Sequence, residues 1–282
     1  MRKYLSLIKF SHTIFAMPFA LIGFFLAAKS NEYEWITLLY VVLCMIFARS
    51  AAMAFNRYID RDIDSANSRT AKVREIPNGS IKASSALIFV IINSFLFIST
   101  TYLINSVCFV LSPIALLVIL GYSYTKRITA LCHLILGLGL ALAPIGAYLA
   151  VSGVFAITPL LFSAAILFWV SGFDIIYSLQ DEEFDKQQEL YSIPVLIGKK
   201  NAINLSNFFH FLTFIALAFA GNLGDFDNLY WIGLSIFSFL LVYQHTLVKH
   251  NDLSKLNLAF FTTNGIASII FGLFVIADLL LK

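Results

Sequence analysis

The chain has 282 residues, of which 60% are hydrophobic and only 12% are charged. That balance excludes an ordinary soluble domain, in which charged residues make up about a quarter of the chain. The net charge of +3 is too small, in so apolar a chain, to indicate a nucleic-acid-binding surface.

Apolar stretches long enough to cross a bilayer recur along the whole sequence. About 20 apolar residues in a helix span the hydrocarbon core, and nine stretches meet that requirement. They are residues 10–28, 36–55, 84–104, 106–123, 131–150, 157–177, 202–221, 229–248 and 257–281. The prediction is an all-α, polytopic membrane protein: a single domain, 1–282, with nine transmembrane helices bundled around a central cavity.

The distribution of Lys and Arg predicts the orientation of these helices. With the N-terminus inside, 16 of the 19 basic residues fall in inside segments, only Lys29 and Lys282 fall outside, and Arg49 lies within a span. Lys and Arg accumulate in cytoplasmic loops. We therefore expect a cytoplasmic N-terminus, cytoplasmic loops after the second and sixth helices, and a C-terminus outside.

The first long polar loop, residues 56–83, begins with regularly spaced oxygen ligands. Asn56, Asp60 and Asp64 follow one another at intervals of four, which on a continuous helix places them along one stripe. Carboxylates so close together repel one another unless they share a cation. Mg²⁺ prefers hard oxygen ligands and commonly binds through a few carboxylates and substrate phosphates. The alternative is a solvated, charged loop.

The second long polar loop, residues 178–200, repeats this arrangement. Three acidic residues and one aromatic residue run from the end of the sixth span into this loop, in the series Asp174, Tyr177, Asp181 and Asp185. Asp60 and Asp181 are 121 residues apart, and so are Asp64 and Asp185. This predicts two pseudo-repeat halves, about 36–150 and 157–281, each with an acidic motif at its entry helix. The alternative is a coincidence of spacing.

Two ionisable residues lie inside apolar spans, where they are costly and usually functional. Asp174 lies in the sixth span, and Arg49 lies in the second span, seven residues before Asn56 and so on the same helix face. The alternative for each residue is an interhelical salt bridge.

Basic residues surround the two acidic motifs, as a bound anion would require. They are Arg57, Arg61, Arg69, Lys72, Arg74, Lys126 and Arg127. Retention of positive charge on the inner side is the alternative explanation for any one of them.

Common catalytic signatures are missing. The sequence has no phosphate-binding glycine loop, no HExxH and no GxSxG. The five histidines, His12, His133, His210, His245 and His250, show no ligand spacing, and we interpret each as a polar packing residue.

Three segments together resemble the UbiA superfamily of intramembrane aromatic prenyltransferases. Residues 56–64, with Arg69-Thr70 and Pro77-Asn78-Gly79, look like its first signature, and residues 174–185, with Ser192-Ile193-Pro194, resemble its second. Residues 122–127 match its short basic segment after the fourth helix. One departure is Arg74-Glu75-Ile76, where many members carry Arg-Pro-Leu. The start of the chain, residues 8–18, looks most like bacterial 4-hydroxybenzoate polyprenyltransferases and the related enzymes that prenylate a dihydroxynaphthoate for menaquinone.

The resemblance implies an enzyme of a bacterial inner membrane that transfers a polyprenyl group from its diphosphate to an aromatic acid in quinone biosynthesis. Its site residues then take three roles. Magnesium is held by Asn56, Asp60, Asp64, Asp181 and Asp185, the diphosphate is held by Arg69, Arg74, Lys126 and Arg127, and the acceptor is met by Asp174, Tyr177, Arg49 and Lys9.

Three other functions compete with this interpretation. A dihydroxynaphthoate acceptor, for menaquinone, is the nearest. A membrane transporter would explain intramembrane Asp174 and Arg49, but not two metal-type motifs at one membrane edge. A CDP-alcohol phosphotransferase would carry a DGxxAR signature, which this sequence lacks.

Overall fold

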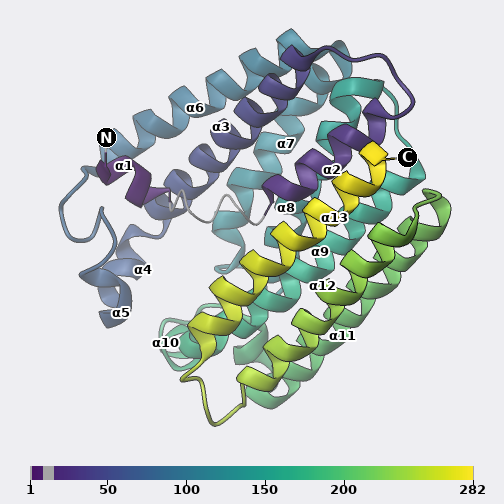
Figure 1. Ribbon diagram of the computed structural model, residues 1–282. Helices are drawn as coiled ribbons and strands as arrows, with labels where there is room; N and C mark the ends of the chain where they lie inside the picture. The colour runs from purple at the N-terminus through teal and green to yellow at the C-terminus, as the bar shows by residue number, and fades with distance from the viewer. Residues whose placement is uncertain (1, 9–15, 282) are drawn as a thin grey trace.

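The computed structural model describes residues 2–8 and 16–281, and over these residues the chain is helical with no β-strand. Figure 1 shows long helices bundled together, with short helices gathered at one end. The prediction of an all-α protein is confirmed.

Long helices form where the apolar stretches predict them. They are α2 (Met17–Ala28), α3 (Trp35–Ile59), α6 (Ala83–Ile104), α7 (Ser106–Thr125), α8 (Cys132–Ser152), α9 (Ile157–Ser178), α11 (Ile193–Leu223), α12 (Asn228–Leu247), and the π-helix η3 (Leu258–Thr263) continued by α13 (Asn264–Leu281). Within the described part of the chain, seven helices are long and apolar enough to cross a membrane, and α2 is a shorter apolar helix. The protein is therefore an integral membrane protein.

The count of nine spans stays a prediction. The described part of α2 has only 12 residues, and the expected residues 10–15 of that span lie outside the described chain. α12 has 20 residues and carries Asn228, Gln244 and His245 near its ends, and it is not among those seven helices. The expected seventh span, residues 202–221, lies within a longer helix, because α11 begins at Ile193. This helix is kinked at Gly198, whose φ is 78°.

Helix α9 lies at the centre of the packing, between α8 and α11. Two glycines bring the three backbones close. A Cβ on Gly137 of α8 would lie 2.5 Å from the Leu167 carbonyl oxygen of α9, and a Cβ on Gly172 of α9 would lie 2.5 Å from the His210 ring of α11. Small residues are the usual means of close approach between membrane helices. Around α9 a buried aromatic cluster includes Phe162 and Trp169.

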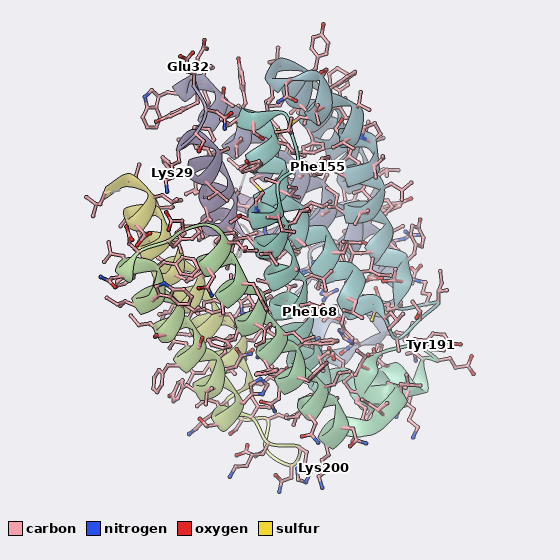
Figure 2. All side chains as sticks on the ribbon, turned by 90° about the vertical axis from the view of Figure 1, so that its right-hand side faces the viewer. Lys29, Glu32, Phe155, Phe168, Tyr191 and Lys200 are labelled. Carbon is pink, nitrogen blue, oxygen red and sulfur yellow. The ribbon has the colours of Figure 1, made fainter. Side chains whose placement is uncertain are left out.

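The polar loops lie together at one end of the bundle. The short helices α4 (Arg61–Ala66), α5 (Ser68–Ala71) and α10 (Glu182–Gln187) occupy the same end in Figure 1. Figure 2 shows Tyr191 and Lys200 at this end and Lys29 and Glu32 at the opposite end. Segments more than 100 residues apart in sequence are thus adjacent in space.

Candidate active site

The first acidic motif bends at its middle residue. α3 ends at Ile59 and Asp60 is its C-cap, so the predicted continuous helix is interrupted there. The backbone bonds from Asp60 N to Asn56 O (2.9 Å) and from Asp64 N to Asp60 O (2.7 Å) carry the helical spacing across the bend. Asn56 and Asp60 remain in contact through their side chains, since Asn56 Nδ2 donates to Asp60 Oδ2 at 3.0 Å.

Asp60 is buried between two basic residues from the end of α7. Lys126 Nζ lies 2.9 Å from Asp60 Oδ2, and Arg127 Nη1 lies 3.0 Å from Asp60 Oδ1. Arg127 also donates to the Ile59 carbonyl at 3.0 Å, which caps the C-terminus of α3. The side chain of Asp60 is only 3% exposed, so its charge depends on these two partners.

Asp64 and Arg74 form a second ion pair within the same loop. Arg74 Nη1 donates to Asp64 Oδ2, and the Asp64 side chain is buried. Thr70 supports the turn between them by donating to the Asp64 carbonyl at 2.8 Å.

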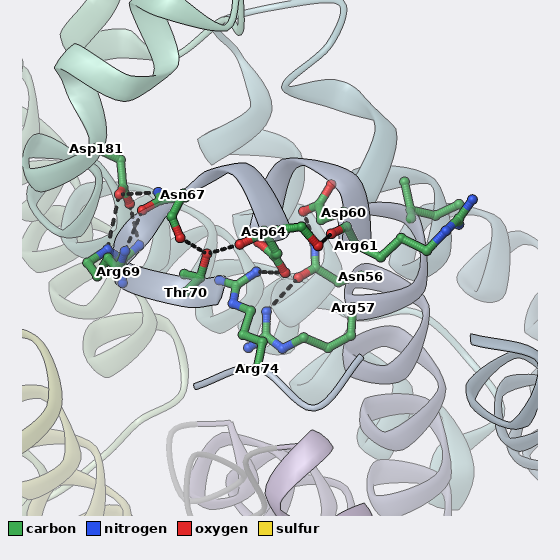
Figure 3. A network of polar contacts seen from close by, with 12 residues as sticks. Asn56, Arg57, Asp60, Arg61, Asp64, Asn67, Arg69, Thr70, Arg74 and Asp181 are labelled. Carbon is green, nitrogen blue, oxygen red and sulfur yellow. Dashed lines mark hydrogen bonds and ion pairs between the residues drawn. The ribbon is translucent and has the colours of Figure 1, made fainter. Parts of the chain in front are cut away.

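The second motif is broken into three helical pieces. α9 ends at Ser178, the 3₁₀ helix η2 covers Leu179–Asp181, and α10 begins at Glu182. These breaks turn Asp181 toward the first loop. Arg69 donates two hydrogen bonds to Asp181, from Nε to Oδ1 at 3.1 Å and from Nη2 to Oδ2 at 2.6 Å (Figure 3). Asn67 Nδ2 donates a third to Asp181 Oδ1, at 3.2 Å. Burial lowers the pKa of the Arg69 guanidinium, but the Asp181 carboxylate and the Tyr177 hydroxyl together outweigh it and raise that pKa above its ordinary value.

The predicted metal and diphosphate residues are thus neighbours. Each of the four basic residues predicted to bind diphosphate is ion-paired with a predicted metal ligand. Asp185 lies near Asp181 and Lys126 within electrostatic range. Over residues 2–8 and 16–281, no three acidic, histidine or cysteine side chains converge on one point that could hold a metal ion, because the carboxylates face separate cations.

The composition of this cluster fits magnesium together with a diphosphate. The ligands on offer are carboxylate and amide oxygens, which Mg²⁺ prefers. The cations that now neutralise Asp60, Asp64 and Asp181 are suited to diphosphate oxygens as well. A metal–diphosphate unit would therefore find, for each charge it carries, side chains of the opposite sign that are now paired with one another.

An apolar cavity of about 360 Å³ lies between α3, α6, α7 and α8. Its lining is almost entirely aliphatic and aromatic, and Arg49 and Tyr122 are its main polar side chains. Arg49 Nε is buried and has no hydrogen-bond partner among the described residues. A buried donor without a partner is costly, so Arg49 Nε is free to bind an anionic group in the cavity.

Two of the predicted acceptor residues lie on α9, away from the described lining of this cavity. Tyr177 stacks on Phe260 with ring centroids 4.2 Å apart, and its hydroxyl accepts from Arg69 Nη1 at 3.4 Å. Asp174 pairs with His133 at 2.7 Å. Asp174 therefore does have the interhelical partner that the sequence left as an alternative, whereas Arg49 has no such partner among residues 2–8 and 16–281. The fourth acceptor residue, Lys9, lies outside the described residues.

Several residues of the site were not selected from the sequence. Asn67 caps α5 by accepting the Arg69 N–H at 2.9 Å while it donates to Asp181. Glu75, the residue that departs from the family pattern, is buried and accepts from Ser6 of α1 (Arg2–Leu7) at 2.5 Å. His133, which the sequence led us to interpret as a packing residue, is the partner of Asp174. Spacing gave no signal for the contacts of Asn67 with Asp181, Glu75 with Ser6 or His133 with Asp174, because in each pair the partner lies on another element.

Known proteins resemble this chain over nearly its full length. The model of the UbiA prenyltransferase family matches residues 16–266. A 4-hydroxybenzoate octaprenyltransferase of Aliivibrio fischeri (strain MJ11) is 30% identical over 253 residues, which cover 88% of this chain and 85% of that protein. A similar enzyme of Tolumonas auensis is 29% identical over 224 residues, 79% of this chain and 78% of that protein.

Solved structures share the fold. The apo structure of a UbiA homolog from Aeropyrum pernix K1 has 29% sequence identity and a TM-score of 0.86, covering 95% of this chain and 98% of that one. A UbiA homolog from Archaeoglobus fulgidus bound to GPP and Mg²⁺ has 22% identity and a TM-score of 0.73, covering 98% and 99%. With the family model matched over residues 16–266, and with the predicted acidic and basic residues in contact at one end of the bundle, this chain belongs to the UbiA prenyltransferase family.

Proposed function

We propose that this protein transfers a polyprenyl group from polyprenyl diphosphate to an aromatic acid of the 4-hydroxybenzoate type, as a step of ubiquinone synthesis. The observation that carries the proposal is the cluster of three carboxylates and four cations at the end of the bundle. The curated relatives named 4-hydroxybenzoate octaprenyltransferase support the choice of acceptor.

The chain's own residues have separate tasks in this reaction. Arg69, Arg74, Lys126 and Arg127 bind the diphosphate oxygens, and Asn56, Asp60, Asp64, Asp181 and Asp185 hold magnesium. When bound, the metal supplies positive charge to the departing diphosphate. The apolar cavity excludes water from the allylic cation that remains after the diphosphate leaves. The Archaeoglobus homolog, whose structure holds GPP and Mg²⁺, supports this assignment.

Arg49 is the proposed partner of the acceptor carboxylate. It lies on α3 at the cavity, its Nε is buried and has no partner among the described side chains, and it lies seven residues before Asn56, about two helical turns from the metal motif. An aromatic acid held there would place its ring between Arg49 and the diphosphate cluster. Asp174 and Tyr177 are proposed to orient the acceptor hydroxyl from the side of α9.

The arrangement in the membrane is part of the proposal. Nine spans, with the N-terminus and the loops 56–83 and 178–200 in the cytoplasm and the C-terminus outside, agree with the distribution of Lys and Arg. The pseudo-repeat of residues 36–150 and 157–281 is supported by Asp60 and Asp181, each of which follows the end of a long helix, α3 or α9. Bacterial relatives point to the inner membrane.

An acceptor panel tests this function. Purified protein in lipid nanodiscs is given polyprenyl diphosphate, Mg²⁺ and, in separate reactions, 4-hydroxybenzoate, a dihydroxynaphthoate or homogentisate, and the products are identified by mass spectrometry. We expect prenylated 4-hydroxybenzoate, lost on adding EDTA and in Asp60→Ala and Asp181→Ala. Product from the dihydroxynaphthoate alone would move the enzyme to menaquinone synthesis. No turnover with any phenolic acceptor would contradict the proposal and favour a transporter.

A further inference from the structure

His133 joins three helices at a point that sequence spacing did not reveal. It is in the first turn of α8 and is 3% exposed. Its Nδ1 lies 2.7 Å from Asp174 Oδ2 of α9, and its Nε2 accepts the Ile193 backbone N–H at the start of α11, at 3.3 Å. Ser171 of α9 donates to the His133 carbonyl at 3.1 Å.

These contacts determine which ring nitrogen carries the proton. A nitrogen that accepts a backbone N–H has no hydrogen of its own, so Nε2 is unprotonated. The ring proton is therefore on Nδ1, which donates it to Asp174 Oδ2. Asp174 is held as an acceptor on this side, and its other oxygen has no hydrogen-bond partner among residues 2–8 and 16–281. Its side chain remains 23% exposed.

The same ring is near the other end of the second acidic motif. Ile193 follows Ser192, and both Ser192 and His133 lie within electrostatic range of Asp185. Close packing keeps this arrangement rigid, since Gly137, one turn along α8 from His133, leaves no room for a side chain against Leu167 and Ser171 of α9. A ring held from two sides in a tightly packed interface restrains whatever it contacts.

We infer that His133 is a positioning residue for the prenyl transfer reaction: it holds Asp174 as an oriented carboxylate with one oxygen left for the aromatic acceptor's hydroxyl. The inference rests on the proposed function and adds a residue to it. His133 itself touches no substrate. Its effect on the reaction therefore passes through Asp174. Substitutions of His133 and of Asp174 should then have effects on activity that are not independent.

Two substitutions separate positioning from packing. In His133→Gln the side-chain amide both donates and accepts, so it can replace the bonds to Asp174 and to the Ile193 N–H. In His133→Leu neither bond is possible, although the volume is similar. We expect His133→Gln to keep most of the activity. His133→Leu should lower kcat/KM for the acceptor by about 10- to 100-fold, as expected for a misplaced catalytic contact, with little change in donor KM.

A double-mutant cycle with Asp174→Asn gives the decisive activity measurement. If His133 acts through Asp174, then His133→Leu causes no further loss in the Asp174→Asn background. Losses that multiply would overturn the inference, and so would a His133→Leu enzyme with wild-type acceptor kinetics. Exposed His250→Leu is the matched control and should have no effect. The thermal unfolding temperature of His133→Leu in detergent, expected to stay near that of the wild type, shows that the fold is kept.

A spectroscopic measurement tests the contact without any turnover, so it stands even if the proposed function fails. Protein labelled with ¹⁵N-histidine should show His133 as the Nδ1–H tautomer, and Asp174→Asn should shift its ¹⁵N resonances while leaving those of His250 unchanged. An Nε2–H tautomer, or no shift in Asp174→Asn, would refute the pairing. Prenylated product missing from the wild-type protein would instead refute the proposed function.

Discussion

At the scale of single residues, the site is a set of charges whose partners are exchangeable. Asp60, Asp64 and Asp181 are each paired with Arg or Lys, so none of these carboxylates is left as an uncompensated charge before substrate arrives. Arg49 differs, because its Nε has no partner among the described residues. A partly buried cation with a free donor beside an apolar cavity is suited to bind an anionic acceptor.

Replacing Arg49 tests this difference. Arg49→Leu should raise KM for 4-hydroxybenzoate by more than about tenfold, because a buried charge pair with the carboxylate is lost. It should also abolish the preference for 4-hydroxybenzoate over the neutral 4-hydroxybenzamide, measured as the ratio of their kcat/KM values. Arg61→Leu, a change in a partly exposed side chain, is the control. An unchanged preference would remove Arg49 from the acceptor site.

Arg69 offers a second test, because its contacts require a forked cation. It contacts both oxygens of Asp181 as well as the Tyr177 hydroxyl, and the single ammonium of Lys cannot reproduce that geometry. Arg69→Lys should raise donor KM on the order of tenfold, the equivalent of one charge-assisted hydrogen bond. Donor titrations of the variant measure this, with Lys72→Arg on the same loop as control. Equal donor KM in wild type and Arg69→Lys would contradict the assignment.

At the scale of the elements, the breaks in the helices create the site. α3 stops at Ile59 and α9 at Ser178, and the short helices that follow turn their carboxylates toward each other's loops. Uninterrupted helices would have left Asp181 out of reach of Arg69. The long helices supply a rigid frame, in which α9 is held against α8 and α11 through Gly137 and Gly172.

Gly137 gives a prediction for this frame. Gly137→Ala places a Cβ 2.5 Å from both the Leu167 carbonyl oxygen and Ser171 Oγ, so α8 and α9 must separate. We expect a destabilisation of about 1–3 kcal/mol, seen as a lower thermal unfolding temperature in detergent. Gly146→Ala on the same helix, where a Cβ meets nothing within 4 Å, should be neutral or slightly stabilising. A stable Gly137→Ala would show that this interface is looser than the structure has it.

At the scale of the whole molecule, both polar loops lie at one end of a bundle of apolar helices. They therefore share one side of the membrane, as the distribution of Lys and Arg requires, while the assignment of that side to the cytoplasm stays a prediction.

Cysteine accessibility tests that orientation. In a background without Cys44, Cys108 and Cys132, single cysteines at the exposed positions Ser65 and Glu183 should react with a membrane-impermeant maleimide only from the cytoplasmic side. A cysteine at exposed Glu32 should react only from the outside. Labelling of Glu32→Cys and Glu183→Cys from one side would contradict the predicted topology.

Sequence by itself determined the membrane class, the approximate bounds of the long helices and the two acidic motifs, because hydropathy and residue spacing are local properties of a helix. It also indicated which basic residues accompany those motifs. Only the tertiary structure decided which charge faces which: Asp60 with Lys126 and Arg127, Asp181 with Arg69, and Asp174 with His133. The reason is physical. Such partners lie on different helices, and their contact depends on where a helix breaks and how closely its neighbours pack.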